Sequence, residues 1–457
     1  MSVADLGVPL YAVVRTTGNM VFAAGGGGGS ATGVPNTIAA CSLSSSGRIS
    51  LDSLTSTHPH AVMTLAAAPT AGVLLAAEEE AIGVYDIAHL LPKGTLAGAP
   101  ARAAAAPAAA APAASSPSTS KASSASASTS TEPATAASGA SDESDAPKNA
   151  SDGDDAAPGT ALGLTKIAEW KADLSKDEPR VRKVVVADAA RLVATTGSEG
   201  RIRVWKLEHP EYTRVHTLTG HTGVVRDLAF NMYASRIASV SQQDGTLKIW
   251  NVSMGSLIRS VAVETVAAAI EGALDSGPMS AVRSAVGGSP GRAKAGSKSR
   301  LSFRTVFYNR SSNRQCLILG LTGKIAGASE PSSHVAVIDA ETGAVVTTLK
   351  VADEPMTAMA YADDGSLLGI ATGERVYIVQ VSASPSGLLR LAHFVSVTPH
   401  PLLVTSLAFS SNNSHVLTVS VDRTLVATRI TGSSRSLFLV IALFLATAAL
   451  YYYFVLA

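Results

Sequence analysis

Cysteine, aromatic residues and net charge are all scarce in this sequence. Cys41 and Cys316 are the only cysteines among 457 residues, which excludes a disulfide framework and is typical of a chain that folds in a reducing compartment. Aromatic residues make up 5%, and 36 Lys and Arg against 35 Asp and Glu leave a formal net charge of +1. Such a balance gives no overall field that would attract a nucleic acid, so we expect no nucleic-acid partner. The first twenty residues also lack the basic segment and apolar run of a cleaved signal peptide.

The common patterns of covalent and metal chemistry are missing too. Five consecutive glycines, residues 25–29, do not complete Gly-x-Gly-x-x-Gly in any frame, and no Gly-Lys-Ser/Thr follows them. Ser30 lacks the flanking glycines of a nucleophile elbow. His58 and His60 form an isolated His-x-His with no carboxylate or cysteine at ligand spacing, so a metal site there is disfavoured. We therefore predict a binding protein and not an enzyme.

Composition divides the chain into four parts: residues 1–96, 97–160, 161–431 and the C-terminal run 436–457. Residues 1–96 and 161–431 contain short apolar runs separated by turns, whereas residues 97–160 are Ala, Ser, Pro and Thr with too few large apolar side chains for a core. We expect the latter to be a disordered insertion; its acidic end is either a spacer, which we favour, or a partner-binding tail. Residues 267–300, irregular and basic, form a second expected insertion, again either a spacer or a contact for anionic lipid.

The last 22 residues, 436–457, carry no charge, and a helix needs about 20 apolar residues to cross a bilayer. Arg423, Arg429 and Arg435 precede this run, and three tyrosines, residues 451–453, lie near its far end. Basic residues favour the cytosolic side and tyrosines the membrane interface. The sequence therefore predicts a single C-terminal transmembrane helix with the larger N-terminal part in the cytosol.

The parts between the insertions show a repeat. "TTGSEGRIRVWKL" ends on a strand with Trp205, and "GHTGVVRDLAFNMYASRIASVSQQDGTLKIWNV" ends on one with Trp250, 45 positions later. A Gly-His start, an Asp in a tight turn and a strand ending in Ile-Trp are typical of a WD40 blade with a period of about 40 to 45 residues. His221 and Asp244 are then structural polar residues of the blade and not a binding site.

Five weaker copies complete the count. Strands equivalent to that of Trp250 recur near Cys41, Tyr85, Ile338, Val379 and Thr428, which with the two tryptophans makes seven. We therefore predict an all-β fold, a seven-bladed WD40 β-propeller whose insertions are loops. A closed ring hides the sheet edges, and its closure needs an N-terminal strand in the last blade. We assign that role to "VPLYAVVR", residues 8–15.

The segment "AAGGGGGSATGVPN", residues 23–36, follows an apolar strand in the first blade. Glycines reach positive φ without penalty, so the carbonyl oxygens of residues 26–29 could turn toward one centre and bind a cation. Pro35 fixes its own φ and restricts Val34, which would present the Asn36 amide outward. The alternative is a long hairpin connection without a function, since glycine-rich loops are common.

This segment resembles the loop of the endoplasmic-reticulum exchange factors that activate the small Arf-like GTPase which initiates COPII coats, and the layout of propeller plus anchor is similar too. The resemblance implies that Gly26, Gly27, Gly28 and Gly29 hold a potassium ion through main-chain oxygens. It also implies that Gly33, Val34, Pro35 and Asn36 act on the GTPase.

By this resemblance the chain is a guanine nucleotide exchange factor of the endoplasmic-reticulum membrane that promotes GDP release without covalent chemistry. Two alternatives stay open. The first is a membrane-anchored WD40 scaffold that aids protein exit without exchange activity, and the second is a membrane-tethered enzyme with a site in the propeller channel.

Overall fold

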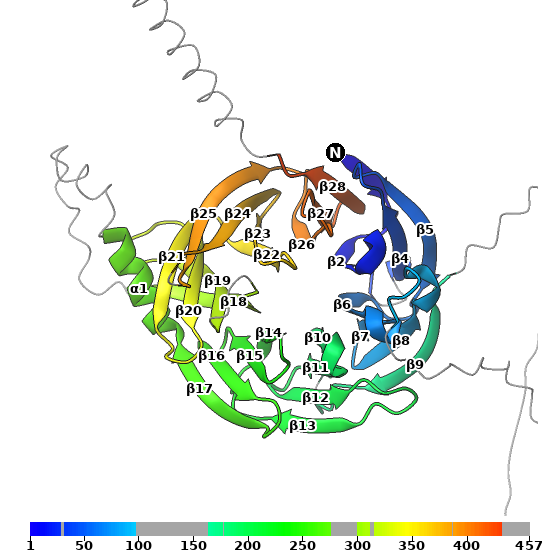
Figure 1. Ribbon diagram of the computed structural model, residues 1–457, viewed down its shortest axis with the longest axis horizontal. Helices are drawn as coiled ribbons and strands as arrows, with labels where there is room; N and C mark the ends of the chain where they lie inside the picture. The colour runs from blue at the N-terminus through cyan, green and yellow to red at the C-terminus, as the bar shows by residue number, and fades with distance from the viewer. Residues whose placement is uncertain are drawn as a thin grey trace, which may run out of the picture. The chain divides into compact units, whose positions relative to one another are not determined.

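The fold is described from a computed structural model that covers residues 1–28, 32–96, 163–176, 178–275, 299–310, 315–385 and 387–431. These residues belong to one compact unit. The expected insertion 97–160 and the expected anchor 436–457 lie outside the described residues. In the described part, seven four-stranded antiparallel sheets are arranged as blades around a central channel (Figure 1).

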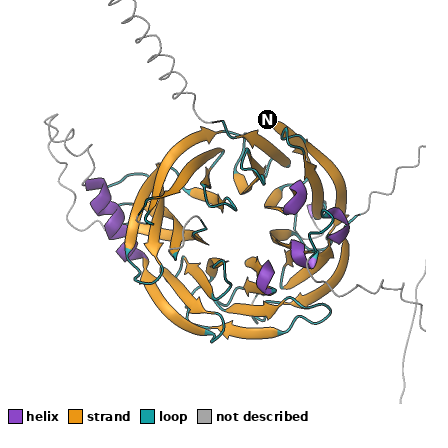
Figure 2. Ribbon diagram, viewed as in Figure 1, coloured by secondary structure: helices purple, strands orange, loops and turns teal. Residues whose placement is uncertain are grey.

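Each blade contributes its first strand to the channel and its last to the rim, and Figure 2 shows that strands build almost the whole ring. The innermost strands are β2 (Leu10–Arg15), β6 (Val62–Ala68), β10 (Lys183–Ala187), β14 (Val225–Phe230), β18 (Arg300–Tyr308), β22 (Met356–Tyr361) and β26 (Val404–Phe409). The second strands are β3 (Met20–Gly25), β7 (Val73–Glu78), β11 (Leu192–Thr196), β15 (Arg236–Ser241), β19 (Cys316–Lys324), β23 (Leu367–Thr372) and β27 (His415–Ser420).

The third strands are β4 (Thr37–Leu43), β8 (Ala81–Asp86), β12 (Ile202–Lys206), β16 (Thr246–Asn251), β20 (Ser332–Asp339), β24 (Arg375–Ala383) and β28 (Thr424–Arg429). The outermost are β5 (Ile49–Ser56), β9 (Thr165–Lys171), β13 (Arg214–Leu218), β17 (Ser256–Ala262), β21 (Val345–Ala352), β25 (Leu389–Val397) and β1 (Ser2–Asp5). All seven strands predicted from the repeat are third strands, one in each blade, so the predicted number of blades and their phase are confirmed.

The ring is closed by a different segment from the one expected. β1 pairs with β28, with Ser2 opposite Ala427 and Asp5 opposite Thr424. The assignment of residues 8–15 to this role was wrong, because Leu10–Arg15 forms β2, the innermost strand of the first blade. Its apolar character comes from burial between blades, whereas the closing strand lies at the rim and alternates between half-buried and exposed residues.

One helix departs from the all-β expectation. α1 (Val263–Asp275) begins directly after β17 and packs on β17, β18 and β21 at the outside of the ring (Figures 1 and 2). Val263, Val266 and Ile270 recur at helical spacing and join the core around Phe303. The predicted irregular insertion therefore does not begin at residue 267, since helix α1 continues through that position. Short 3-10 turns also occur in the described part of the chain. The turns η1 (Thr17–Asn19), η3 (Pro69–Ala71) and η5 (Asp188–Ala190) follow the innermost strands β2, β6 and β10, and η4 (Ala88–Leu90) follows β8.

A buried hydrogen-bonded chain holds the fourth blade together. The Trp250 indole N–H donates to Ser239 Oγ at 2.8 Å, Ser239 Oγ lies 2.8 Å from His221 Nε2, and His221 Nδ1 lies 2.8 Å from Asp244 Oδ2. Burial lowers the pKa of His221, opposed by the Asp244 carboxylate. The imidazole is thus a fixed internal link, as the sequence predicted for His221 and Asp244.

The seventh blade repeats this chain without the tryptophan. His400 Nδ1 lies 2.9 Å from Asp422 Oδ2, and His400 Nε2 lies 2.8 Å from Thr418 Oγ1.

Candidate functional site

The candidate site is the glycine-rich loop, residues 26–36, which joins β3 to β4 in the first blade. Successive strands of a blade are antiparallel, so this loop lies at the end of the ring where the innermost strands begin. We call this end the entry face. The connection from β5 to β6, residues 57–61, lies on the same face and next to the loop, as their hydrogen bonds show. Residues 29–31 lie outside the described part of the chain.

Asn36 faces inward. Its side chain is buried, with only 2% of the residue exposed. The amide Nδ2 donates to the carbonyl oxygens of Gly28 and Pro59, both at 2.8 Å, and Oδ1 accepts the Gly28 N–H at 3.1 Å. The expectation that Asn36 points outward was therefore wrong. An amide carries both donors and an acceptor, and here all three of its hydrogen bonds go to main-chain groups of Gly28, which is half-buried, and Pro59, which is exposed, so the buried amide itself is satisfied.

The consequence is that Asn36 joins two connections on the entry face. Its main-chain carbonyl also accepts the Thr57 N–H at 2.9 Å, so side chain and backbone both hold the β5–β6 connection. The sequence carried no signal for this role of Pro59. Residues 36 and 59 become neighbours only when the first blade folds and brings its β3–β4 and β5–β6 connections to the same face. His58 and His60 do not converge on a shared site; His60 Nδ1 lies 3.2 Å from Glu79 Oε2.

Glycine is required where the loop starts. Gly26 has φ +144° and Gly28 has φ +83°, in the region that side chains rarely adopt. A Cβ atom on Gly26 would lie 2.1 Å from Asn36 Oδ1, and one on Gly27 would lie 2.4 Å from Thr32 Oγ1. The start of the loop, residues 26 and 27, therefore contacts its end, residues 32–36, and larger residues than glycine would force the two apart.

The outward part of the loop is the turn of residues 32–35. Thr32, Gly33, Val34 and Pro35 are all exposed, with 36% of Val34 accessible, in contrast to the buried Asn36 that follows them. Gly33 has φ +69°, and Pro35 fixes the backbone on the other side. We call residues 32–35 the exposed turn. It presents an apolar side chain and a proline ring on a base held by Asn36.

The loop also gathers neutral oxygen atoms. A Cβ on Gly26 would lie 2.8 Å from the Pro35 carbonyl oxygen, and Asn36 Oδ1 and Thr32 Oγ1 come even closer to the Cβ positions of Gly26 and Gly27. Neutral oxygens of this kind suit a potassium ion. The Gly28 carbonyl, however, already accepts the Asn36 amide, and Gly29 lies outside the described residues.

Among the described residues, no group of three or more His, Cys, Asp and Glu side chains is arranged to hold a metal. Nor does any helix in these ranges have the length and apolar character needed to span a membrane.

Comparison with known proteins identifies the repeats. The family model "WD domain, G-beta repeat" matches residues 212–251 and 393–426. The F-box/WD repeat-containing protein sel-10 of Caenorhabditis elegans is 30% identical over 70 residues, which is 15% of this chain and only 11% of that protein.

A chain from a crystal structure of the mitotic checkpoint complex superimposes with a TM-score of 0.54 at 14% identity, covering 94% of this chain and 90% of that one. At this identity the likeness concerns the fold alone. The chain thus carries WD40 repeats and is an all-β, seven-bladed β-propeller.

Proposed function

We propose that this propeller is a guanine nucleotide exchange factor for the small Arf-like GTPase that starts COPII coat assembly, and that residues 436–457 hold it in the endoplasmic-reticulum membrane. The observation that carries the proposal is the exposed turn, residues 32–35, in a loop whose sequence resembles that of these exchange factors. The WD40 propeller supplies the rigid base on which such a turn can act on a partner.

Exchange of this kind makes and breaks no covalent bond. A factor accelerates GDP loss when it binds the nucleotide-free GTPase more tightly than the GDP-bound form. In our proposal Val34 and Pro35 contact the region of the GTPase that closes over the nucleotide. Gly33 allows the bend, and Asn36 acts as a positioning residue that holds the turn in place through Gly28 and Pro59. This replaces direct action of the Asn36 amide, which its burial disfavours.

Potassium belongs to the same proposal. The carbonyl oxygens of Gly26, Gly27 and Gly29 would hold the ion, with Gly28 contributing only a lone pair that the Asn36 amide leaves free. When bound, the ion would supply a positive charge that keeps these carbonyl dipoles together; the Asn36 hydrogen bonds hold the lower part of the loop without it.

The test measures release of labelled GDP from the COPII GTPase by the full-length protein in lipid vesicles. We expect wild type to accelerate GDP release. In the double variant Val34→Ala, Pro35→Gly the acceleration should be at least tenfold smaller. Asn36→Ala should lose a similar factor, because the turn is no longer held. Asn251→Ala is the matched control, since Asn251 caps a β16–β17 turn on the opposite face and should leave the rate unchanged.

Sodium in place of potassium tests the ion: we expect slower release for wild type and no further loss for Asn36→Ala. If wild type accelerates GDP release in neither salt, the proposal is overturned.

The second candidate is a membrane-anchored WD40 scaffold that aids protein exit without exchange activity. The inward Asn36 favours it, because the amide cannot reach a partner while bound to Gly28 and Pro59. Binding of the GTPase without faster GDP release would support this candidate.

A further inference from the structure

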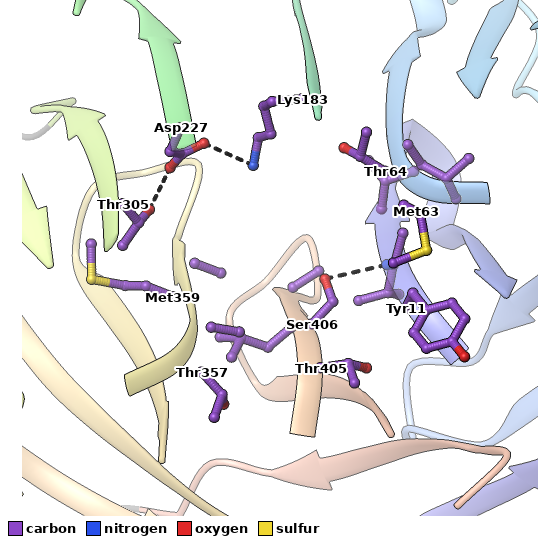
Figure 3. A pocket seen from close by; sticks show the side chains of 18 of the residues that line it. Tyr11, Met63, Thr64, Lys183, Asp227, Thr305, Thr357, Met359, Thr405 and Ser406 are labelled. Atoms are coloured by element: carbon purple, nitrogen blue, oxygen red, sulfur yellow. Dashed lines mark hydrogen bonds and ion pairs between the residues drawn. The ribbon is translucent and has the colours of Figure 1, made fainter. Parts of the chain in front are cut away.

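The central channel holds a cavity of about 700 Å³ whose lining comes from the innermost strands of all seven blades and runs from their starts at the entry face to their far ends; Figure 3 shows part of it. Cavities of roughly 300 to 1,000 Å³ are the size at which proteins hold small molecules. The cavity is distinct from the glycine-rich loop, whose residues do not line it.

The repeat places one side chain per blade at the same level of this cavity. Most innermost strands have a bulge near their start, where the pairing with the second strand skips a residue. The skipped residues are Tyr11, Arg226, Arg304, Thr357 and Thr405, and all of them line the cavity.

Two blades differ in detail. The second blade skips Met63 and Thr64, and Arg182 stands just before β10 in the third. Three consecutive blades therefore contribute arginine at this level. We call Arg182, Arg226 and Arg304 the arginine arc.

A single carboxylate fixes the strands that carry the arc. Asp227 Oδ2 accepts the Thr305 hydroxyl at 2.5 Å and the Val306 N–H at 3.1 Å, and Asp227 Oδ1 lies 3.0 Å from Lys183 Nζ (Figure 3). Asp227 thus links β10, β14 and β18, and each arc residue directly precedes one residue of this network. The negative charge of Asp227 is engaged by Lys183 and is not available to the arginines.

Arg226 and Arg304 have no carboxylate of their own. Within the described residues neither guanidinium makes an ion pair or a side-chain hydrogen bond, although Arg304 is only partly exposed. Burial lowers the pKa of Arg304, and the charge of Arg226 lowers it further. Two like charges held together at a cavity wall destabilise each other, and a bound anion would reverse that effect. Arg182 differs, since it shares a smaller hollow with Glu79, Glu80 and Glu178.

We propose that the entry-face mouth of the channel binds a polyphosphorylated small molecule of the inositol polyphosphate class, either free or as a lipid headgroup, with Arg226 and Arg304 as its main ligands and Arg182 beside them. Guanidinium groups bind phosphate through two parallel hydrogen bonds, so adjacent arginines match adjacent phosphates. The rest of the ring at this level is uncharged and carries the hydroxyl groups of Tyr11, Thr357 and Thr405. Such groups suit the hydroxyls of an inositol or sugar ring.

The binding experiment uses the full-length protein in detergent micelles and inositol hexakisphosphate as the probe, measured by isothermal titration calorimetry. We expect wild type to bind, Arg226→Gln and Arg304→Gln each to weaken binding by about tenfold or more, and the double variant to lose it. Arg390→Gln is the control, because Arg390 is an exposed arginine on the rim strand β25 and should bind like wild type.

Thermal unfolding separates binding from misfolding. The probe should raise the melting temperature of wild type and of Arg390→Gln, raise that of Arg304→Gln by less, and leave that of the double variant unchanged. Without the probe, Arg304→Gln should unfold at the same temperature as wild type or higher, because it removes a repulsion. If the double variant does not fold, the test rests on Arg226→Gln, because Arg226 is exposed; binding of the probe as tight as that of wild type would then count against the proposal.

The source of the phosphate is distinguished by vesicles that contain phosphatidylinositol bisphosphate, with phosphatidylcholine vesicles as reference. Recruitment that Arg226→Gln abolishes identifies a lipid headgroup, whereas binding of the free probe alone identifies a soluble ligand. Equal binding by wild type and the double variant would overturn the proposal. So would an Asp- and Glu-rich peptide that binds as tightly as the probe, since it would show that phosphate geometry is not recognised.

Discussion

The connection between the second and third strands takes two forms in this ring. In the fourth blade it is the short turn of residues 242–245, where Asp244 binds His221 of the connection that enters the same blade. In the first blade it is the glycine-rich loop, where Asn36 binds Pro59 of the connection that leads to the next blade. The first arrangement stiffens one blade, whereas the second joins two blades and leaves residues 32–35 exposed above the junction. The same connection of a repeat can therefore serve either to pack one blade or to present an exposed turn.

The largest effect should come from the fourth blade. Trp250→Ala removes a fully buried side chain and its hydrogen bond to Ser239, so we expect about 3 to 5 kcal/mol less stability in urea unfolding. Cys41 occupies the equivalent position of β4, since Trp250 pairs with Ile237 as Cys41 pairs with Val21. Cys41→Ala should cost only about 1 kcal/mol. Similar losses for the two variants would show that the blades do not differ in this way.

His334 is a buried histidine whose hydrogen-bond partner is a serine, whereas His221 is paired with the carboxylate of Asp244. His334 in β20 is 1% exposed and lies 2.9 Å from Ser332 Oγ, and burial together with Lys350 lowers its pKa to about 4. The native state then binds its proton more weakly than the unfolded state, whose histidine titrates near pH 6.5.

Stability should therefore be complete above about pH 6.5 and fall by about 2 to 3 kcal/mol between pH 6.5 and 4. His334→Gln should remove that part of the slope in urea titrations at several pH values. An unchanged slope would show that other groups cause it.

Asn36→Ala should act locally. It leaves the Gly28 N–H and the carbonyls of Gly28 and Pro59 without the side chain that satisfies them, at a cost of about 1 to 3 kcal/mol to the closed loop. We expect faster hydrogen exchange at Gly28 and in residues 57–61 by mass spectrometry, with protection in β14–β17 unchanged. Faster exchange throughout the ring would instead assign Asn36 to global stability.

The smallest effect should come from Gly33→Ala. Its φ of +69° strains an alanine by about 1 kcal/mol, while no atom lies within 4 Å of the added Cβ. We expect the urea midpoint to fall only slightly, by no more than this strain implies, and the GDP-release rate to decrease modestly. Gly7→Ala at φ +76°, also in open space, is the matched control and should leave that rate unaltered.

The repeat made much of the fold predictable, because a period of about 45 residues fixes the third strand of every blade. Residues 2–5 were missed as the closing strand because four residues with two exposed side chains carry too weak a pattern. α1 was missed because it adjoins a stretch of similar small residues. The direction of Asn36 depends on Pro59, and the arginine arc depends on residues 44 and 78 positions apart in the chain. Neither contact leaves a local signal.

The pairing of β1 with β28 has a mechanical consequence. β28 is the last described strand, so a pull on the chain beyond Thr431 reaches the ring through this strand, which is held by β27 on one side and by residues 2–5 on the other. If the chain is held at that end, a pulling force reaches the seventh blade, where β1 pairs with β28, before it reaches any other blade. The pairing of the short strand β1 with β28 would then carry part of that force, together with the pairing of β27 with β28.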